Sequence, residues 1–527
     1  MPVPDAAMPG RRQFLTRLAS AAVAMSTSGG LLAACGGRPV VWPSPVVRPK
    51  RGGNLKLGLT GGSSADTLDP HQGVTDLDYA RFNSLYQPLV WLDPQAEIEY
   101  VLAESITPYQ GSLSRWVIRL RSGITFHSGK ELTADDVIYT FRRIITNGYG
   151  GKSPLAPVDL NSTRALDQQT VLVQMTKPYS SFVEQLAAIF VYLYIVPSGF
   201  NPLRPNGTGP FVYESFTPGQ RSVFVRNKNY WKTGLPYADT LTILDFPDTV
   251  SLADALITGA VQGAGTLDGT QIPQLATRGG IKAVASPGGS IVPFTMRVDR
   301  PPFNDVRVRQ ALRLLVDRPQ LIESALDGQG TLASDVFSPF DPDFDSSLRR
   351  IQDIDQAKFL LKQAGHENLT ITLTTSPVIS GTVAMALVLA EQATEAGVTI
   401  HVQDVPPGTF FGPDYLSWTF AQDYYPYSPY LAQVAYSMLP VSPFNETHTD
   451  NPGYISLYNQ ANATPSDSAL HKEILHEMQE FDFTQGGYII PAFPDSLDAY
   501  SDTISGYSIC KQGNPLSNFD FEHFYFK

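Results

Sequence analysis

LAESITPYQGSLSRWVIRLRSGITFHSGKELTADDVIYTFRRI, residues 102–144, carries the clearest structural pattern in the chain. From Trp116 to Leu120, large apolar residues recur at every second position, which is the period of a half-buried strand. Ser-Gly pairs at 122–123 and 128–129 predict turns on either side of His127. We expect this histidine to stabilise the turn and not to bind a metal.

A helix is predicted directly after these turns. Thr133 and Asp136 have the spacing of a capping box, in which each side chain binds the backbone N–H of the other residue. Their position also places negative charge at the positive end of the helix dipole. Four apolar residues fall on one face of the helix and are expected to be buried: Val137, Phe141, Ile144 and Ile145.

Local signals of the same kind continue on both sides of this block. Residues 54–60 alternate leucines with polar residues and predict a strand, and Thr75 can cap a helix that follows it. Further along, strands at 211–216 and 222–226 are separated by Pro218-Gly219, which predicts a hairpin.

The C-terminal half mixes helices and strands in the same way. Asp305 begins a helix whose apolar residues face inward, so we expect its arginines on a solvated or domain-facing side. Helices at 384–396 and 470–481 precede a buried strand at 488–490. The fold class predicted from this mixture is α/β.

Residues 10–37, GRRQFLTRLASAAVAMSTSGGLLAACGG, have the pattern of an export signal. The paired arginines resemble a twin-arginine signal. The weakly apolar run that follows them contains too many serine and glycine residues for a membrane anchor. Its ending, Leu32-Ala33-Ala34-Cys35, resembles the lipobox of bacterial lipoproteins. We therefore expect an export signal over 1–34, lipidation of Cys35, and a proline-rich tether over 35–51.

Composition limits the class of protein. The 527 residues are 43% hydrophobic and 17% charged, which suits two or three globular cores. Without residues 1–34 the chain has 35 basic and 49 acidic residues, a net charge of −14 that argues against nucleic acid and anionic lipid as partners. Only two cysteines are present, so lipidation of Cys35 leaves Cys510 without a disulfide partner.

Catalytic and metal-binding motifs are weak or missing. The sequence has no G-x-S-x-G and no H-E-x-x-H pattern. Ser508 to Lys511 fits S-x-x-K but lacks the other motifs of such enzymes, and the Gly-Lys-Ser at 151–153 lacks the first glycine of a phosphate loop. His471 and His476 are five residues apart and so lie on different sides of a helix. We expect no catalytic residue, no metal site and no cofactor.

The block at 102–144 resembles the signature block of the family 5 extracellular solute-binding proteins, the oligopeptide and dipeptide receptors of ABC importers. Further blocks agree in the same order: GTGPFVYESFTPGQRSVFVRNKNYW (207–231), PPFNDVRVRQALRLLVDR (301–318) and DQAKFLLKQAG (355–365). The resemblance implies a two-lobed α/β fold like that of periplasmic binding proteins, with an extra domain and a hinged ligand cleft. It also implies domain boundaries: lobe I from 52–91, 206–290 and 485–527, extra domain II from 92–205, and lobe III from 291–484.

The resemblance also indicates ligand-binding residues. By the family pattern of an aspartate soon after a tryptophan, Asp423 would bind the amino terminus of a peptide, with Trp418, Phe420 and Tyr424 beside it. Two readings of the residues stay open, because Asp423 can also cap the following turn and the aromatic residues from 410 to 430 can form either core or a cleft wall. Further cleft positions follow from the resemblance: Gly73, Val74, Phe294 and Phe493.

The sequence thus predicts an extracytoplasmic solute-binding lipoprotein of an ABC transporter that captures an oligopeptide or dipeptide and delivers it to membrane permease subunits. We expect a monomer, not an enzyme, that is held at the cell membrane by lipid alone and does not bind nucleic acid. Three alternatives stay open: the same class of receptor for an oligosaccharide, opine or nickel complex, a secreted lipoprotein peptidase, and a surface adhesin that keeps the receptor fold without transport.

Overall fold

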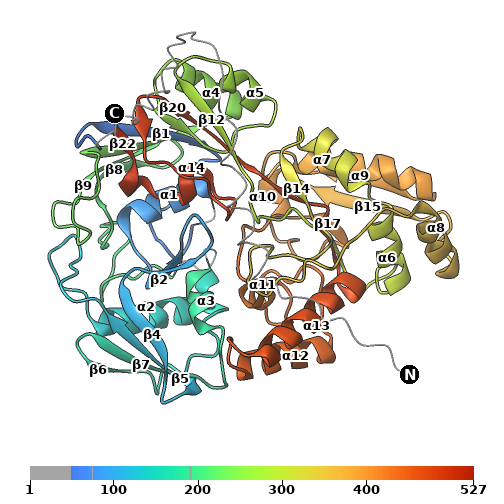
Figure 1. Cartoon of the computed structure of the whole chain (residues 1–527), viewed down its shortest axis with the longest axis horizontal. Helices are drawn as coiled ribbons and strands as arrows, with labels where there is room; N and C mark the ends of the chain where they lie inside the picture. Colours follow the sequence, from blue (N-terminus) through green and yellow to red (C-terminus); the bar gives the residue numbers. More distant parts are fainter. Residues whose placement is uncertain (1–48, 74, 189–192) are drawn as a thin grey trace, which may run out of the picture. The chain divides into compact units, whose positions relative to one another are not determined.

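The computed structural model describes residues 49–73, 75–188 and 193–527 (Figure 1). The predicted export signal, Cys35, most of the tether and Val74 lie outside the described residues. The contacts separate residues 1–47 from residues 48–527, and the second unit holds every element named below. No helix within the described ranges has the length and apolar character needed to cross a membrane.

The first large sheet has seven strands in the order β12-β20-β11-β1-β10-β9-β8. Their bounds are β1 Asn54–Thr60, β8 Phe211–Thr217, β9 Arg221–Arg226, β10 Thr240–Phe246, β11 Gly263–Ala264, β12 Ile281–Ser286 and β20 Ser496–Ser501. Strand β1 runs parallel to β10 and β11, and the predicted hairpin is formed by β8 and β9. The leucines of β1 are at most 1% exposed, as their alternation predicts.

Three helices flank this sheet: α1 Asp76–Leu85, α4 Thr249–Ile257 and α5 Gln271–Ala276. Thr75 caps α1 as predicted, because its hydroxyl accepts a hydrogen bond from the Asp78 N–H at 3.1 Å. The C-terminal elements of the chain also lie here: α14 Pro515–Asn518, β21 Ile504–Ser505 and β22 Tyr525–Phe526.

The block at 102–144 builds a separate four-stranded sheet, in the order β4-β5-β7-β6, which a capped helix covers. The bounds are β4 Ala103–Tyr109, β5 Ser112–Leu120, β6 Arg164–Asp167, β7 Thr170–Gln174 and α2 Ala134–Asn147. The capping box of Thr133 and Asp136 is confirmed. Of the predicted buried face, Ile145 alone is only half-buried.

The turn at His127 connects two sequence blocks that are far apart in the chain. His127 Nε2 lies 3.1 Å from the carbonyl oxygen of Gly209, and the His127 N–H donates to the Gly207 carbonyl at 2.8 Å. A Cβ on Gly207 would lie 2.0 Å from the Leu85 carbonyl oxygen, so only glycine allows this approach. His127 therefore stabilises a turn, as predicted.

The third sheet has five strands in the order β16-β15-β17-β13-β18. The bounds are β13 Phe294–Met296, β15 Thr370–Thr375, β16 Thr399–Asp404, β17 Phe420–Gln422 and β18 Tyr488–Ile489. Helices α6 Val306–Leu314, α7 Arg318–Ala325, α8 Ile354–Gln363 and α9 Thr382–Ala393 belong to the same part of the chain. Helices α11 Tyr430–Ser437, α12 Pro452–Ala463 and α13 Ala469–Gln485 follow.

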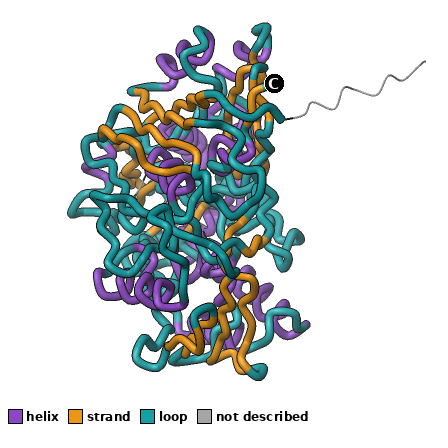
Figure 2. Tube along the Cα trace, turned by 90° about the vertical axis from the view of Figure 1, so that its left-hand side faces the viewer, coloured by secondary structure: helices purple, strands orange, loops and turns teal. Residues whose placement is uncertain are grey.

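The remaining short elements connect these layers. They are β2 Val90–Leu92, β3 Ile98–Tyr100, α3 Phe182–Ala187, β14 Gly330–Leu332, α10 Pro407–Phe410 and β19 Ala492–Pro494. Figure 2 shows strands, helices and loops mixed through the unit, as an α/β fold requires.

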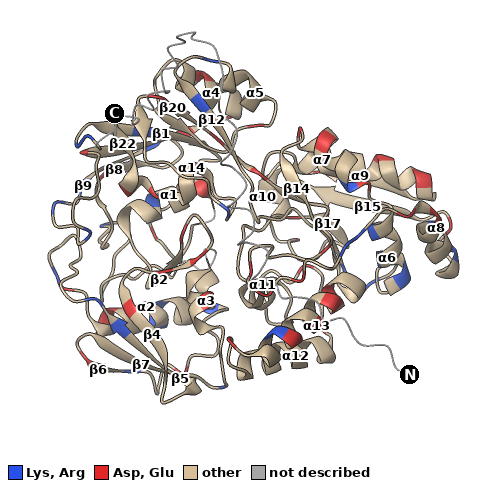
Figure 3. Ribbon diagram, in the orientation of Figure 1, with Lys and Arg blue, Asp and Glu red and all other residues tan. Residues whose placement is uncertain are grey.

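The expectation that the arginines of α6 lie on a solvated or domain-facing side is wrong for two of them. Arg309 and Arg313 are 6% and 0% exposed. Arg313 donates to the carbonyl oxygens of Phe483, Gly486 and Tyr488 at 2.7–2.9 Å, and Arg309 binds carbonyls of the same segment. The last carbonyls of a helix lack partners within the helix, and the donors of a guanidinium fit them well. Figure 3 shows the basic residues along α6.

The proposed domains each contain one of the three sheets. Strand β18 pairs with β13 in the sheet of the proposed lobe III, whereas β20 lies in the sheet of lobe I. We therefore propose that the chain returns to lobe I between Ile489 and Ser496, a few residues later than the family pattern implies.

Candidate functional site

Asp423 follows strand β17 directly and is held rigidly. Its carboxyl group is buried, with the residue 2% exposed. Oδ2 accepts a hydrogen bond from the Tyr415 hydroxyl at 2.7 Å, and Oδ1 accepts one from the Tyr424 N–H at 2.7 Å. The second bond is the turn cap that one reading of the sequence predicted. The cap does not exclude a ligand, because each carboxylate oxygen can accept a second hydrogen bond.

A second carboxyl group, that of Glu446, lies beside Asp423. Glu446 is 4% exposed, and neither of its oxygens makes a hydrogen bond of good geometry, although Asp423, Thr295 and Tyr415 are within reach. Burial and the neighbouring negative charge of Asp423 raise the pKa of Glu446 well above its usual range. Burial also raises the pKa of Asp423. Burial and mutual repulsion therefore oppose two negative charges on the Asp423 and Glu446 pair in the absence of a cation.

Two more acidic residues come from the other large sheet and the helix beside it. Asp498 on β20 is 2% exposed, and its Oδ1 has no hydrogen-bond partner among the described residues. Burial, followed by smaller effects that include the charge of Asp76, raises the pKa of Asp498 to about 7. Asp76, the first residue of α1, is half-buried, and burial raises its pKa to about 6.

Tyr424 connects the two acidic pairs. Its side chain is half-buried, and burial raises the pKa of its hydroxyl, with further contributions from the charges of Asp76 and Asp423. The phenol is therefore close to carboxylates from both sheets. No lysine or arginine among the described residues forms an ion pair with Asp76, Asp423, Glu446 or Asp498.

Aromatic residues support Tyr415, the hydrogen-bond donor to Asp423. Trp418 stacks on Phe410 with ring centroids 6.3 Å apart, and its indole N–H donates to the Phe410 carbonyl at 3.2 Å. Tyr415 packs edge-on against Phe411 at 5.2 Å. In this structure Trp418 thus belongs to a small core behind Tyr415, and its indole donor is already used.

The other predicted residues are not all near Asp423. Phe294 and Phe420 pack against each other at 6.4 Å in the core of the five-stranded sheet, where each is at most 1% exposed. Phe493 on β19 is 4% exposed within a hydrophobic cluster. Gly73 is buried against α1, because a Cβ there would lie 2.3 Å from the Phe82 ring. Gly73 and Phe420 each lie three positions before an acidic residue of the site, Asp76 and Asp423 respectively.

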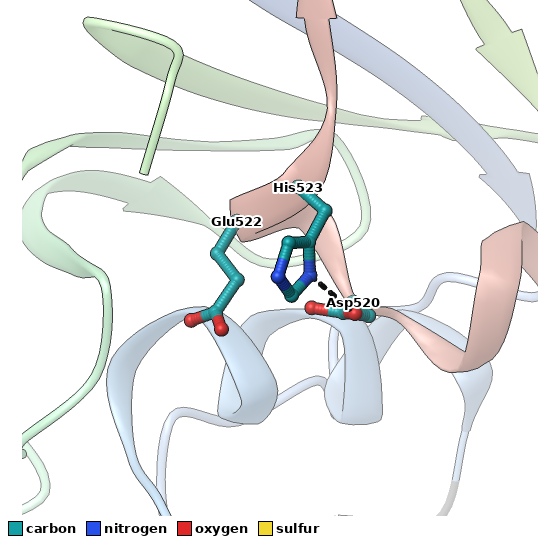
Figure 4. Close-up of side chains that lie close together, drawn as sticks. All are labelled: Asp520, Glu522 and His523. Atoms are coloured by element: carbon teal, nitrogen blue, oxygen red, sulfur yellow. Dashed lines mark hydrogen bonds and ion pairs between the residues drawn. The ribbon is translucent and has the colours of Figure 1, made fainter. Parts of the chain in front are cut away.

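A separate group of possible metal ligands lies near the C-terminus (Figure 4). His523 Nδ1 is 2.6 Å from Asp520 Oδ2, and this bond raises the pKa of His523. Glu522 accepts a hydrogen bond from the Tyr230 hydroxyl and an ion pair from Lys232 at 2.9 Å. Protein donors thus already occupy both Glu522 oxygens, so we assign the group a structural role.

The profile of the bacterial extracellular solute-binding proteins, family 5 Middle, matches residues 97–454. This chain belongs to that family. A family 5 relative, the glutathione-binding protein GsiB of Escherichia coli O1:K1, is 30% identical over 359 residues, which are 66% of this chain and 69% of the relative. The corresponding protein of Escherichia coli K12 is 29% identical over the same shares.

Solved structures show the same family 5 fold. DppA from Helicobacter pylori in complex with the peptide STSA has a TM-score of 0.79 at 20% identity and covers 90% of this chain and 98% of its own. AgaA from A. tumefaciens R10 in complex with agropinic acid has a TM-score of 0.80 at 19% identity, with 90% and 99% covered. NikA from Staphylococcus aureus in complex with Ni(L-His)2 has a TM-score of 0.77 at 19% identity, with 90% and 100% covered. The predicted two-lobed α/β class is confirmed.

Sequence reasoning missed three of the four acidic residues of this candidate site. Asp76 follows the predicted cleft residues Gly73 and Val74 by three and two positions. An acidic residue so close to a predicted cleft loop was the feature that could have indicated it. Glu446 and Asp498 had no such signal, because one lies in an irregular loop and the other on a strand of the opposite sheet.

The buried acids predict that the ligand-free protein loses stability between pH 6.5 and 8.0. Burial raises the pKa of both Asp482 and Asp498 to about 7. A folded-state pKa above the unfolded value favours the protonated folded form, so this contribution falls as pH rises through 7, by about 1 kcal/mol per group. His71 and His127, whose pKa values burial lowers to about 4, act in the opposite direction only at lower pH. Glu184, whose pKa burial raises to about 8, contributes in the same direction as the two aspartates. Melting temperatures of the wild type and of Asp498→Asn across this pH range check the prediction, because the variant should lose less stability by the contribution of one group.

Proposed function

We propose that this family 5 protein binds peptides through their free amino terminus and delivers them chemically unaltered to the permease of an ABC importer. The observation that carries the proposal is the buried carboxylate of Asp423, which has no basic partner among the described residues. A buried ion needs an opposite charge, and an ammonium group that also donates to Tyr415 or Glu446 would supply it. Phe294, Phe420, Phe493 and Trp418 would then support the site from the core.

The arrangement of the chain supports capture by hinge closure. The connections between the two large sheets run through residues 287–293, after β12, and 490–495, before β20. Short connections of this kind absorb the backbone rotation in hinged proteins. Asp423 and Tyr424 belong to one side, and Gly73 and Asp76 to the other. A peptide that contacts both sides would therefore stabilise the closed form over the open one.

The proposal includes a position outside the cytoplasm and a lipid anchor at Cys35, followed by the tether over residues 35–51. The family description, which names extracellular proteins, supports the position. The lipobox-like sequence supports the anchor. A peptide complex of DppA, a structural neighbour of the same fold, supports a peptide as the ligand rather than a sugar.

Ligand binding to the full chain tests this function. Thermal unfolding would be followed with free and N-acetylated forms of the same di- to pentapeptides, and the peptides would be recovered for mass spectrometry. A bound ligand raises the midpoint according to its affinity and concentration. We expect an upshift with free peptides only and recovery of unchanged peptide. Equal upshifts with acetylated peptides would contradict the ammonium site, and cleaved peptide would indicate the peptidase alternative.

A further inference from the structure

The four unpaired carboxyl groups form two pairs that come from different lobes. Asp423 and Glu446 follow β17 and α11 in lobe III, whereas Asp76 and Asp498 lie on α1 and β20 in lobe I. Tyr424 follows Asp423 directly, and the charge of one carboxylate from each pair, Asp423 and Asp76, contributes to the raised pKa of its hydroxyl. One ammonium group at Asp423 is therefore too small to neutralise both pairs at once.

At three other places the described residues pair buried carboxylates with arginine, whereas buried Asp482 is bound by the Tyr430 and Tyr454 hydroxyls and forms no ion pair. Arg81 binds Asp66 and Asp245 at 2.9 and 2.7 Å, and Arg143 binds Asp69 at 2.6 Å. Two further arginines, Arg318 and Arg350, bind Asp335 at 2.9 and 2.8 Å. The two pairs in question lack such a partner, and they leave three carboxylate oxygens without hydrogen bonds: Glu446 Oε1, Glu446 Oε2 and Asp498 Oδ1. Such unsatisfied groups are expensive in a native protein and mark a site for an external partner.

We propose that the ligand carries two cationic groups, one for each acidic pair, and that a peptide with a free amino terminus and a lysine or arginine side chain supplies them. This inference rests on the proposed function and narrows its substrate class. Asp423 and Glu446 bind the terminal ammonium group, and Asp76 and Asp498 bind the cation of the side chain.

The charge arrangement also links this selectivity to closure. When lobe I and lobe III approach each other, the negative charges of the two acidic pairs move into a region of low polarity, where the repulsion between the pairs is weakly screened. A ligand with two positive charges removes that repulsion across both lobes. A neutral or acidic peptide removes less of it. A dicationic ligand therefore favours the closed form more strongly than a peptide with a single ammonium group.

The test measures affinities of the full chain for Ala-Ala, Lys-Ala, Arg-Ala, Glu-Ala, glutathione and spermidine by isothermal titration calorimetry. We expect Lys-Ala and Arg-Ala to bind at least tenfold more tightly than Ala-Ala, with Glu-Ala and glutathione weaker than Ala-Ala. Asp76→Asn should abolish the advantage of Lys-Ala, so that the variant binds Lys-Ala and Ala-Ala with about equal affinity. The matched control is Asp254→Asn, at an exposed position of α4, which should change neither value.

The outcomes separate this inference from the proposed function. If Ala-Ala binds and Lys-Ala binds no better, the dicationic selectivity is wrong and peptide capture stands. If spermidine binds with an affinity that Asp76→Asn lowers and no peptide binds, the two cationic positions stand and peptide capture is wrong. If glutathione binds more tightly than Lys-Ala, the dicationic selectivity is wrong as well. Circular dichroism of Asp76→Asn would show that the variant is folded.

Discussion

Asp423→Asn is expected to weaken binding of a peptide with a free amino terminus by about 100-fold, which corresponds to about 2.7 kcal/mol. Asparagine keeps the shape of the side chain and can still accept from Tyr415, so the change removes the charge alone. Truncating one partner of a buried charged pair costs about 2–5 kcal/mol, and much of this is the cost of leaving the other charge unpaired. Calorimetric titration of the wild type and the variant with the same peptide measures the difference.

Glu446 gives this prediction an internal check. With Asp423 neutral, Glu446 no longer faces a negative neighbour and can ionise to hold part of the ammonium charge. The double variant Asp423→Asn with Glu446→Gln should therefore bind more weakly than either single variant. Asp414→Asn, at an exposed position of the same segment, is the matched control and should bind like the wild type. A wild-type affinity in the double variant, or an equal loss with the N-acetylated peptide, would contradict an ammonium site at Asp423.

Local patterns of the sequence predicted much of the fold, because short-range physics sets them. The capping box at Thr133, the hairpin of β8 and β9, and the leucines of β1 each depend on residues that are neighbours in the chain. The arginines of α6 were not predictable in this way. Arg313 is buried because carbonyls from residues 483–488 surround it, and nothing within α6 indicates that contact.

The candidate site also combines residues that local sequence indicates with residues that only distant contacts bring together. A local family pattern indicated Asp423, which lies directly after a strand. Glu446 and Asp498 join it only through the packing of distant segments, so neither spacing nor periodicity revealed them. The aromatic residues illustrate the opposite error, since Phe294 and Phe420 fit a ligand pocket by sequence pattern but fill the core of a sheet. Core and ligand-contacting aromatic residues differ in their burial, and burial cannot be read directly from the sequence.

The buried ion network at Arg81 predicts a large loss of stability when this arginine is replaced. Arg81 is 0% exposed, and its guanidinium binds Asp66, Asp78 and Asp245. Its Nε also donates to the Ser222 hydroxyl at 2.7 Å. The network joins α1 to strands β9 and β10 and to the loop after β1. It therefore holds α1, whose first residue is Asp76, against the seven-stranded sheet.

Arg81→Met is expected to destabilise the protein by about 3–5 kcal/mol near pH 8, because removing one partner leaves buried charges without compensation. Urea unfolding followed by fluorescence measures the loss in the transition that includes the seven-stranded sheet. The matched control is Arg307→Met, since Arg307 pairs with Asp305 at 2.6 Å but has a side chain that is 45% exposed. An exposed pair of this kind contributes less than about 1 kcal/mol.

The pH dependence of the Arg81→Met loss distinguishes uncompensated charge from lost packing. In the wild type, burial already raises the pKa of Asp245 to about 6, although Arg81 opposes the shift. Without Arg81 the pKa of Asp245 rises further, so the folded variant gains a proton and recovers stability as pH falls below that value. The destabilisation should therefore be smaller at pH 5.5 than at pH 8. A loss of equal size at both pH values would show that Arg81 acts mainly through its packing on the Phe216 ring, 4.9 Å away.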